Sequence, residues 1–245
     1  MKLLCITPTY GRPIELLQNS LACFYSQTYT NAYQIFLDDT FDGPTIEGDN
    51  YAIVQNNERY SNLSIKHNYA VQIGIDIFGE VDGIVVWDDD DIYLPNHLEN
   101  ISKSLKNGES FSFSSKIYSC LDETVKIEDN TAGRFHGNIA FNYDLFTNNK
   151  WENTLRMDFD TTMIDKLTKS GTVIDRIDPT YVYRWVSSGE HHCSGVSKGP
   201  EDETWYSKTP VIRNKPIQNL EPLYDKNTLL IKDYLKSPQL LNHAS

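Results

Sequence analysis

A short apolar run that leads straight into four aspartates constrains the fold of this chain more than any other stretch. Gly83-Ile84-Val85-Val86 is typical of a buried strand, and Trp87 and the acidic run Asp88-Asp89-Asp90-Asp91 follow at once. Adjacent carboxylates repel each other, and burying one without a partner is costly. The four acids therefore either point into water or surround a positive group, and the second arrangement would mark a site.

The apolar pattern of residues 1–110 alternates between strand and helix. We expect strands at residues 2–7, 33–37, 51–54 and 84–87. We expect helices from Pro13, over residues 63–78 with apolar side chains four apart, and from Pro95. This order is typical of an α/β fold in which a mostly parallel sheet carries helices on both faces.

Polar residues follow three of the expected strands at their carboxyl ends. They are Thr7-Pro8-Thr9-Tyr10-Gly11, the pair Asp38-Asp39, and the acidic run. Ligands of open α/β sheets bind beyond these strand ends. The sequence therefore predicts a ligand site where the three groups meet.

The second half of the chain is less regular. We expect a hairpin over 112–127 with its turn at 121–123, and a loop from residue 133 that runs into a strand ending at 146. A helix over 160–170, strands at 172–177 and 181–185, and a last helix near 229–235 complete the prediction. We find no internal repeat or clear linker, so the chain is expected to form one domain.

Charge and cysteine content narrow the function classes. Lys and Arg total 22 and Asp and Glu total 34, which gives a formal net charge of −12. This charge argues against broad binding to nucleic acid or anionic lipid, although a divalent cation can join carboxylates to a polyanionic ligand.

The four cysteines form no CxxC pair, which favours reduced thiols and a cytoplasmic protein. No run of 18 apolar residues occurs, so no membrane span is expected.

The order and spacing of four motifs resemble those of the family-two glycosyltransferases with the GT-A fold. The motifs are ITPTYGRP, FLDD, a helix that starts near Lys66-His67-Asn68, and WDDDDIYLPNHL. The resemblance covers residues 1–105 well and 130–195 more loosely. It implies a single Rossmann-like GT-A domain with a nucleotide-sugar-binding half (1–110), a smaller mixed acceptor and catalytic half (111–198) and a C-terminal extension (199–245).

The resemblance also implies metal-dependent, inverting sugar transfer from a nucleotide-diphosphate donor, expected to be a UDP-sugar. Asp88 would face the ribose or the metal, Asp89 would contact the donor, and Asp90 would bind Mn²⁺ or Mg²⁺, which both prefer oxygen ligands. A late loop would add His192 or His191 to the same cation. Neighbouring ligands diverge in an extended chain, so we do not expect a zinc site at Glu190-His191-His192-Cys193.

The nucleoside and phosphate contacts follow from the same resemblance. Pro8, Thr9 and Tyr10 would line the base pocket. Asp39, in preference to Asp38, would bind the nucleoside, although Thr40-Phe41 stands where the family usually has Gly-Ser. Candidate phosphate neighbours are Arg12, Lys66 and His67, and the sequence leaves the choice between the last two open.

An inverting transfer needs a carboxylate that removes the acceptor proton. The resemblance points to Asp158, with Asp160 as the alternative, and both acids also suit a plain helix start. Two other functions stay open: a nucleotidyltransferase of related fold, and a nucleotide-sugar-binding module without catalysis. The acceptor is not specified by the sequence; a glycan, a protein, a small molecule or a modified DNA base would each supply a hydroxyl.

Overall fold

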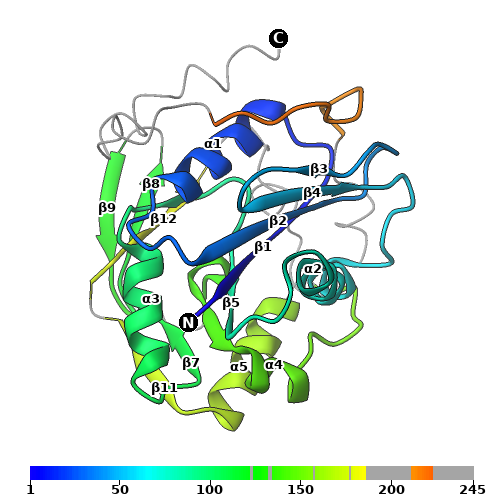
Figure 1. The fold of residues 1–245 in the computed structure, drawn as a ribbon. Coiled ribbons are helices and arrows are strands. Elements are labelled where there is room, and N and C mark those ends of the chain that lie inside the picture. The colour runs from blue at the N-terminus through cyan, green and yellow to red at the C-terminus, as the bar shows by residue number, and fades with distance from the viewer. Residues whose placement is uncertain (122–123, 132–133, 157, 177, 186–210, 223–245) are drawn as a thin grey trace.

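The computed structural model describes residues 1–121, 124–131, 134–156, 158–176, 178–185 and 211–222. An eight-stranded sheet in the order β11-β7-β10-β5-β1-β2-β4-β3 forms its centre (Figure 1). β1 pairs in parallel with β2 and β5, β2 with β4, and β7 with β11, whereas β10 and β3 run antiparallel to their neighbours. The strands are β1 (Leu3–Thr9), β2 (Ala32–Asp38), β3 (Ile46–Glu47), β4 (Tyr51–Gln55), β5 (Gly83–Val86), β7 (Phe111–Phe113), β10 (Ala140–Asn142) and β11 (Val173–Asp175). The predicted mostly parallel sheet is confirmed.

A second, four-stranded sheet lies beside the first in the order β6-β12-β8-β9. Its strands are β6 (Ile92–Tyr93), β8 (Ile117–Leu121), β9 (Thr124–Glu128) and β12 (Tyr181–Trp185). β5 of the large sheet ends at Val86 and β6 of the small sheet starts at Ile92, so the acidic run is the link between the two sheets. This link fixes the position of the four aspartates.

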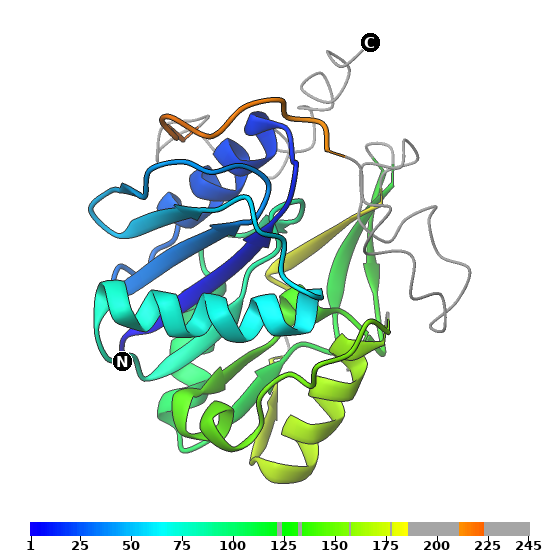
Figure 2. The same cartoon turned by 90° about the vertical axis from the view of Figure 1, so that its right-hand side faces the viewer.

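Helices cover both faces of the large sheet, as the sequence predicts (Figure 2). The alternation of side chains along β1 divides the core: Leu3 and Cys5 pack with α1, α3 and the small sheet, whereas Leu4 and Ile6 pack with α2, α4 and α5. The helices are α1 (Ile14–Tyr25), α2 (Leu63–Phe78), α3 (His97–Lys106), α4 (Tyr143–Asn148) and α5 (Phe159–Ser170), with a 3₁₀ turn η1 (His136–Asn138).

The buried face of α2 is not the expected stripe of large apolar residues. Tyr69 is 50% exposed, whereas Ala70, Val71 and Gly74 are buried. A Cβ atom on Gly74 would lie 2.6 Å from a methyl carbon of Leu4. The helix therefore approaches β1 through its small residues, and the closeness of the backbones decides which face is buried.

Two expectations for the second half need correction. Residues 112 and 113, at the start of the expected hairpin, belong to β7 of the large sheet, and β8 and β9 pair as the hairpin. The expected strand ending at residue 146 stops at Asn142, and α4 follows because Leu145 and Phe146 pack into the core as parts of a helix. The expected helix near 229–235 lies outside the described residues.

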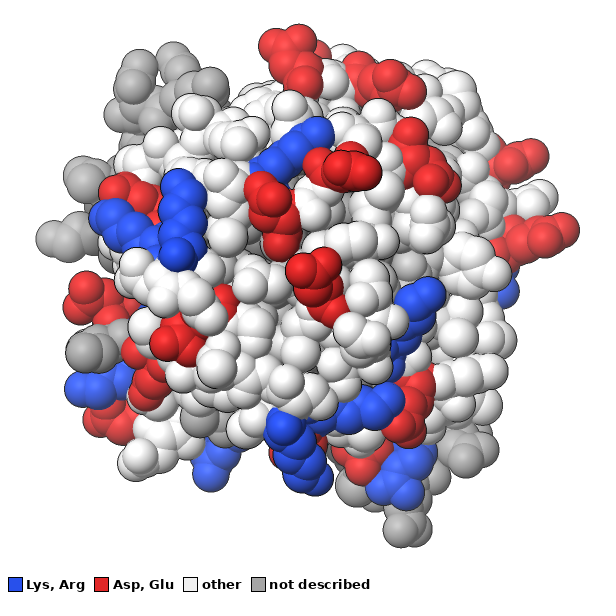
Figure 3. Space-filling view, turned by 60° about the horizontal axis from the view of Figure 1, so that its bottom comes forward, with Lys and Arg blue, Asp and Glu red and all other residues white. Residues whose placement is uncertain are grey.

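Charged side chains of both signs occur on the surface. On the face in Figure 3, Lys and Arg side chains are interspersed with Asp and Glu, and no broad field of positive charge is seen. Among the helices of the described ranges, none combines the length and the apolar character needed to cross a bilayer.

Candidate active site

The aspartates of the acidic run do not splay outward into water. Asp89, Asp90 and Asp91 are only 3%, 8% and 1% exposed, and Asp88 is partly exposed. Buried carboxylates require compensation from cations or hydrogen-bond donors. The acidic run is therefore packed into the junction of the two sheets, and the contacts of each aspartate indicate its role.

Arg12 supplies part of the positive charge that the sequence demands. It comes from the turn after β1 and is 4% exposed. Its Nη2 atom lies 2.6 Å from Oδ2 of Asp90, and its Nε atom lies 3.3 Å from Oδ1 of Asp89. The predicted phosphate neighbour is thus in contact with the acids themselves.

Asp91 holds the small sheet to the acidic run. Its carboxylate accepts hydrogen bonds from the Tyr181 hydroxyl and, at 2.9 Å, from the Arg184 backbone N–H, both on β12. Burial and the charge of Asp90 raise the pKa of Asp91, and these two donors oppose that rise. Asp91 therefore has a structural role.

Asp88 is the member of the run without such partners. Within the described part of the chain, no hydrogen bond or ion pair reaches its carboxylate, although its backbone N–H lies 2.7 Å from the Tyr93 hydroxyl. Burial, then the charges of the other three aspartates and of Asp160, raise its pKa well above the ordinary value. A Cβ atom on Gly137 would lie 2.5 Å from Asp88 Oδ2, so this glycine makes room for the carboxylate.

The donor set can be tested against a divalent cation. No three His, Cys, Asp or Glu side chains form a closed metal site in the described ranges. His192 and His191, the other predicted ligands, lie outside the described residues. Mg²⁺ and similar ions often bind one or two carboxylates and complete their coordination with water and substrate phosphates. No described residue pairs with the Asp88 carboxylate, so its ionised form would fit a cation bound in that open manner.

The two candidate bases stand in different environments at the start of α5. Asp158 accepts hydrogen bonds from Arg156 at 2.6 and 2.9 Å, and this contact lowers its pKa. Burial instead raises the pKa of Asp160, although it accepts a 2.6 Å hydrogen bond from the Thr161 N–H. The charge of Asp160 is among those that raise the pKa of Asp88. Met157, which separates the Arg156 and Asp158 positions, is outside the described residues.

On the nucleoside side, Asp39 and Lys66 form a buried ion pair. The Lys66 ammonium contacts Oδ1 of Asp39 and the Thr9 carbonyl, and the Tyr60 N–H donates to Oδ2 of Asp39 at 2.9 Å. Both side chains are at most 1% exposed. Burial lowers the pKa of Lys66 in spite of the nearby Asp39 charge. The pair therefore fixes the ends of β1, β2 and α2 around the predicted pocket.

His67 lies in an aromatic cluster with His136, Trp151 and Phe159. Its Nδ1 atom bonds to the Leu63 carbonyl at 2.8 Å, and burial lowers its pKa to about 4. An imidazole that is neutral near pH 7 adds no positive charge for a phosphate. We therefore assign His67 to packing, which leaves Lys66 as the basic residue of this helix start.

Arg59 is a residue that sequence reasoning missed. Its guanidinium carbon lies 3.5 Å from the ring centroid of Tyr10, a cation–π contact beside the predicted base pocket. Arg59 follows the end of β4 by a few residues, so the strand-end rule that identified the other groups also applied to it. A second missed residue, Arg213, pairs with Asp38.

No family model and no curated protein matches this chain in sequence. In three dimensions it is similar to S. aureus TarS 1–349 in complex with UDP-GlcNAc, with a TM-score of 0.57 and 14% identity over 77% of this chain and 60% of that one. It is similar to the mannosyltransferase PcManGT from Pyrobaculum calidifontis in complex with GDP-Man and Mn²⁺, with a TM-score of 0.55 and 14% identity over 78% and 59%. The chain has a mixed α/β, GT-A-like fold. It spans about three fifths of the length of each of these structures.

Proposed function

We propose that the protein is an inverting, metal-dependent glycosyltransferase that moves a sugar from a nucleotide-diphosphate donor to an acceptor hydroxyl. The observation that carries the proposal is the Asp88 carboxylate, which no hydrogen bond or ion pair from the described residues reaches. It lies beside the Arg12-paired Asp89 and Asp90 at the sheet junction of a GT-A-like fold. The similar structures hold UDP-GlcNAc in one case and GDP-Man in the other. A UDP-sugar is our first candidate donor, and a GDP-sugar is the second.

The nucleoside would bind against Pro8, Thr9 and Tyr10, with Arg59 stacked on the Tyr10 ring. Asp39 would act here as a fixed carboxylate. Its two oxygens accept from Lys66 and Tyr60, and a nucleoside hydroxyl or N–H would donate to one of these oxygens as well. Lys66 would then serve the site by holding Asp39 in place.

Asp88 and Asp90 would hold Mn²⁺ or Mg²⁺, with His192 as a further predicted ligand. When bound, the cation would stabilise the negative charge of the leaving diphosphate. Arg12 and Asp89 would determine the net charge next to the cation and the donor diphosphate, because the Arg12 guanidinium contacts both Asp89 and Asp90.

For the base we favour Asp160 over Asp158. A general base works best when its pKa approaches the working pH, and burial moves the pKa of Asp160 upward. The Arg156 contact moves the pKa of Asp158 in the opposite direction and engages both of its oxygens. Asp160 would accept the acceptor hydroxyl proton as the sugar moves.

The test is a panel of UDP- and GDP-sugars incubated with the protein and Mn²⁺ or Mg²⁺, with release of nucleoside diphosphate as the readout. We expect release that stops with chelator and in Asp88→Asn, but persists in the exposed-surface control Asp165→Asn. Binding without release would instead indicate a binding module. Pyrophosphate release from a nucleoside triphosphate and a sugar phosphate would indicate a nucleotidyltransferase. Absence of both binding and turnover for all donors would overturn the proposal.

A further inference from the structure

Residues 211–222, which we call the C-terminal strap, lie against the turn that follows β1. The backbone N–H groups of Ile212 and Arg213 both donate to the Gly11 carbonyl, at 2.8 and 3.0 Å. Figures 1 and 2 show the strap, in orange, along the same edge of the molecule as the start of α1. A segment far away in sequence is thus bound to the loop that carries Arg12.

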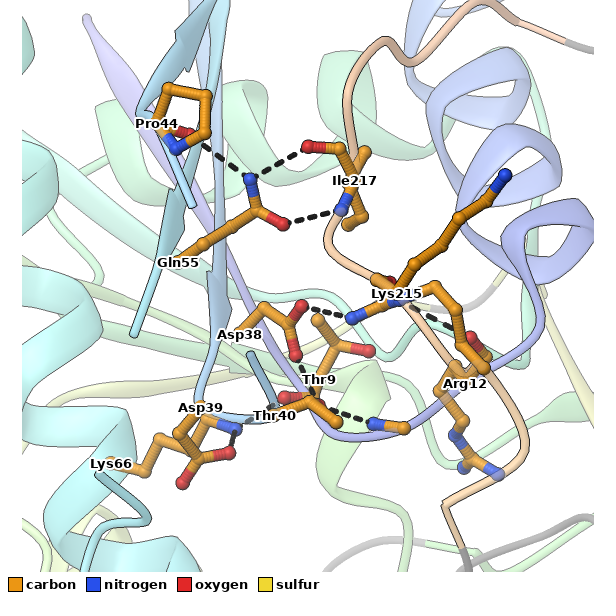
Figure 4. A network of polar contacts seen from close by, with 12 residues as sticks. Thr9, Arg12, Asp38, Asp39, Thr40, Pro44, Gln55, Lys66, Lys215 and Ile217 are labelled. Carbon is orange, nitrogen blue, oxygen red and sulfur yellow. Dashed lines mark hydrogen bonds and ion pairs between the residues drawn. The ribbon is translucent and has the colours of Figure 1, made fainter. Parts of the chain in front are cut away.

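A second set of contacts anchors the strap at the end of β4. The Gln55 amide donates to the Ile217 carbonyl at 2.8 Å and accepts from the Ile217 N–H at 2.6 Å (Figure 4). The Tyr51 hydroxyl donates to the Leu220 carbonyl at 2.9 Å. Ile217 and Leu220 are themselves 2% and 1% exposed. The strap is therefore packed as part of the core.

The Arg213 side chain is buried between these anchors. Its Nη2 atom forms an ion pair with Asp38, and the two side chains are 7% and 0% exposed. Its Nε atom donates to the Lys215 carbonyl at 2.9 Å, which fixes the guanidinium from the other side. A buried charge pair of this kind is costly to break by removal of one partner.

Arg213 closes a ring of hydrogen bonds around the turn. Gly11 N–H donates to Thr40 Oγ1 at 2.6 Å, and the Thr40 hydroxyl donates to Asp38 Oδ1 at 2.5 Å. The Arg213 guanidinium donates to the other oxygen of Asp38, and the Arg213 backbone N–H returns to the Gly11 carbonyl. Gly11 has a φ of +63°, a conformation that glycine adopts without strain. The ring holds this turn in one geometry.

We infer that Arg213 is a positioning residue for the donor site. It acts through the Gly11–Arg12 turn, because the Arg12 side chain reaches Asp89 and Asp90 directly from there. The inference rests on the proposed function, since the affected ligand is the donor diphosphate. Without Arg213 the turn would lose one side of its ring, and Arg12 would no longer be presented to the acids in a single orientation.

The test compares Arg213→Gln with Lys215→Gln, which removes the same charge from an exposed position of the same strap. UDP and GDP binding with Mn²⁺ is measured by calorimetry, and kcat and KM are measured with the donor that the unaltered protein uses. We expect Arg213→Gln to weaken nucleotide binding and raise the donor KM by between about tenfold and a hundredfold, with a smaller change in kcat. Arg213→Lys should restore part of the loss, and Lys215→Gln should leave both constants unchanged.

Thr40→Val tests the same ring without changing Arg213, so it keeps the inference falsifiable if Arg213→Gln does not fold. We expect the same rise in donor KM. Combining Thr40→Val with Asp38→Asn should cause no further rise, because each substitution alone already breaks the same ring of hydrogen bonds. Folded variants with an unchanged donor KM, or an equal effect of Lys215→Gln, would overturn the role of Arg213. If the unaltered protein binds no nucleotide, the proposed function itself fails.

Discussion

The carboxylates of Asp88 and Asp91 belong to one acidic run, yet only that of Asp91 is satisfied by hydrogen bonds. The Tyr181 hydroxyl and the Arg184 N–H hold Asp91, whereas no hydrogen bond or ion pair from the described residues reaches the Asp88 carboxylate. Residues that serve a ligand are often poorly satisfied before it binds, and they reduce stability in that state. The same substitution at these two positions should therefore have opposite effects.

Asp88→Asn should stabilise the metal-free protein by about 0.5–2 kcal/mol near pH 7, in the range of other stabilising changes at functional sites. The raised folded pKa means that the carboxyl favours folding below its ordinary pKa of 3.8, and that this contribution is lost as pH rises through the folded value. The gain from Asp88→Asn should thus vanish near pH 3.8. Urea unfolding of both proteins from pH 8 down to pH 3.5 measures this gain.

Asp91→Asn is the matched control. In Asp91 the Tyr181 hydroxyl and the Arg184 N–H each donate to a different carboxylate oxygen. The substitution replaces one of these oxygens by an NH₂ group, which cannot accept. One of the two donors then lacks a partner, at a cost of about 1–3 kcal/mol. Equal effects of the two substitutions, or a loss of stability in Asp88→Asn near pH 7, would contradict the assignment of Asp88 as the unpartnered acid.

Arg12 should be among the most stabilising charged residues of the protein. Arg12→Gln leaves Asp89 and Asp90 buried without their cation, and removal of one partner of a buried pair costs about 3–5 kcal/mol. Lys126→Gln breaks an exposed ion pair with Glu128 and should change the free energy of unfolding very little. Denaturant unfolding compares the two, and similar small losses would show that the Arg12 contact is unimportant.

The sequence predicted the convergence at the strand ends because parallel pairing of β1, β2 and β5 follows from their apolar runs and intervening helices. It did not predict the partners of each acid. Arg213 reaches Asp38 from an irregular strap without periodicity, and whether Lys66 or His67 faces the pocket depends on the rotation of α2. That rotation is set by the close approach of Gly74 to Leu4, which no apolar count reveals.

The buried histidines offer a spectroscopic test of the core behind the site. Burial lowers the pKa of His67 to about 4 and those of His97 and His136 well below the ordinary 6.5. Groups with a lowered folded pKa stabilise the protein above pH 6.5, and this stability is lost as pH falls through the folded value. The imidazole NMR chemical shifts of these three residues should stay at the values of the neutral ring from pH 7.5 to pH 5. A transition near pH 6.5 in any of them would contradict its burial.

The final prediction separates the two candidate bases, and it applies to the transfer reaction once a donor is known. Asp160→Asn should reduce kcat by about 10²–10⁴-fold, the usual contribution of a positioned proton acceptor, while donor KM changes little. Asp158→Asn removes an acid that Arg156 already holds, so it should retain most of the activity. Pre-steady-state measurement of nucleotide release would show whether the loss lies in the transfer step. The reverse result would return the base to Asp158, and a rise in donor KM in Asp160→Asn would make that residue a donor ligand through its proximity to Asp88.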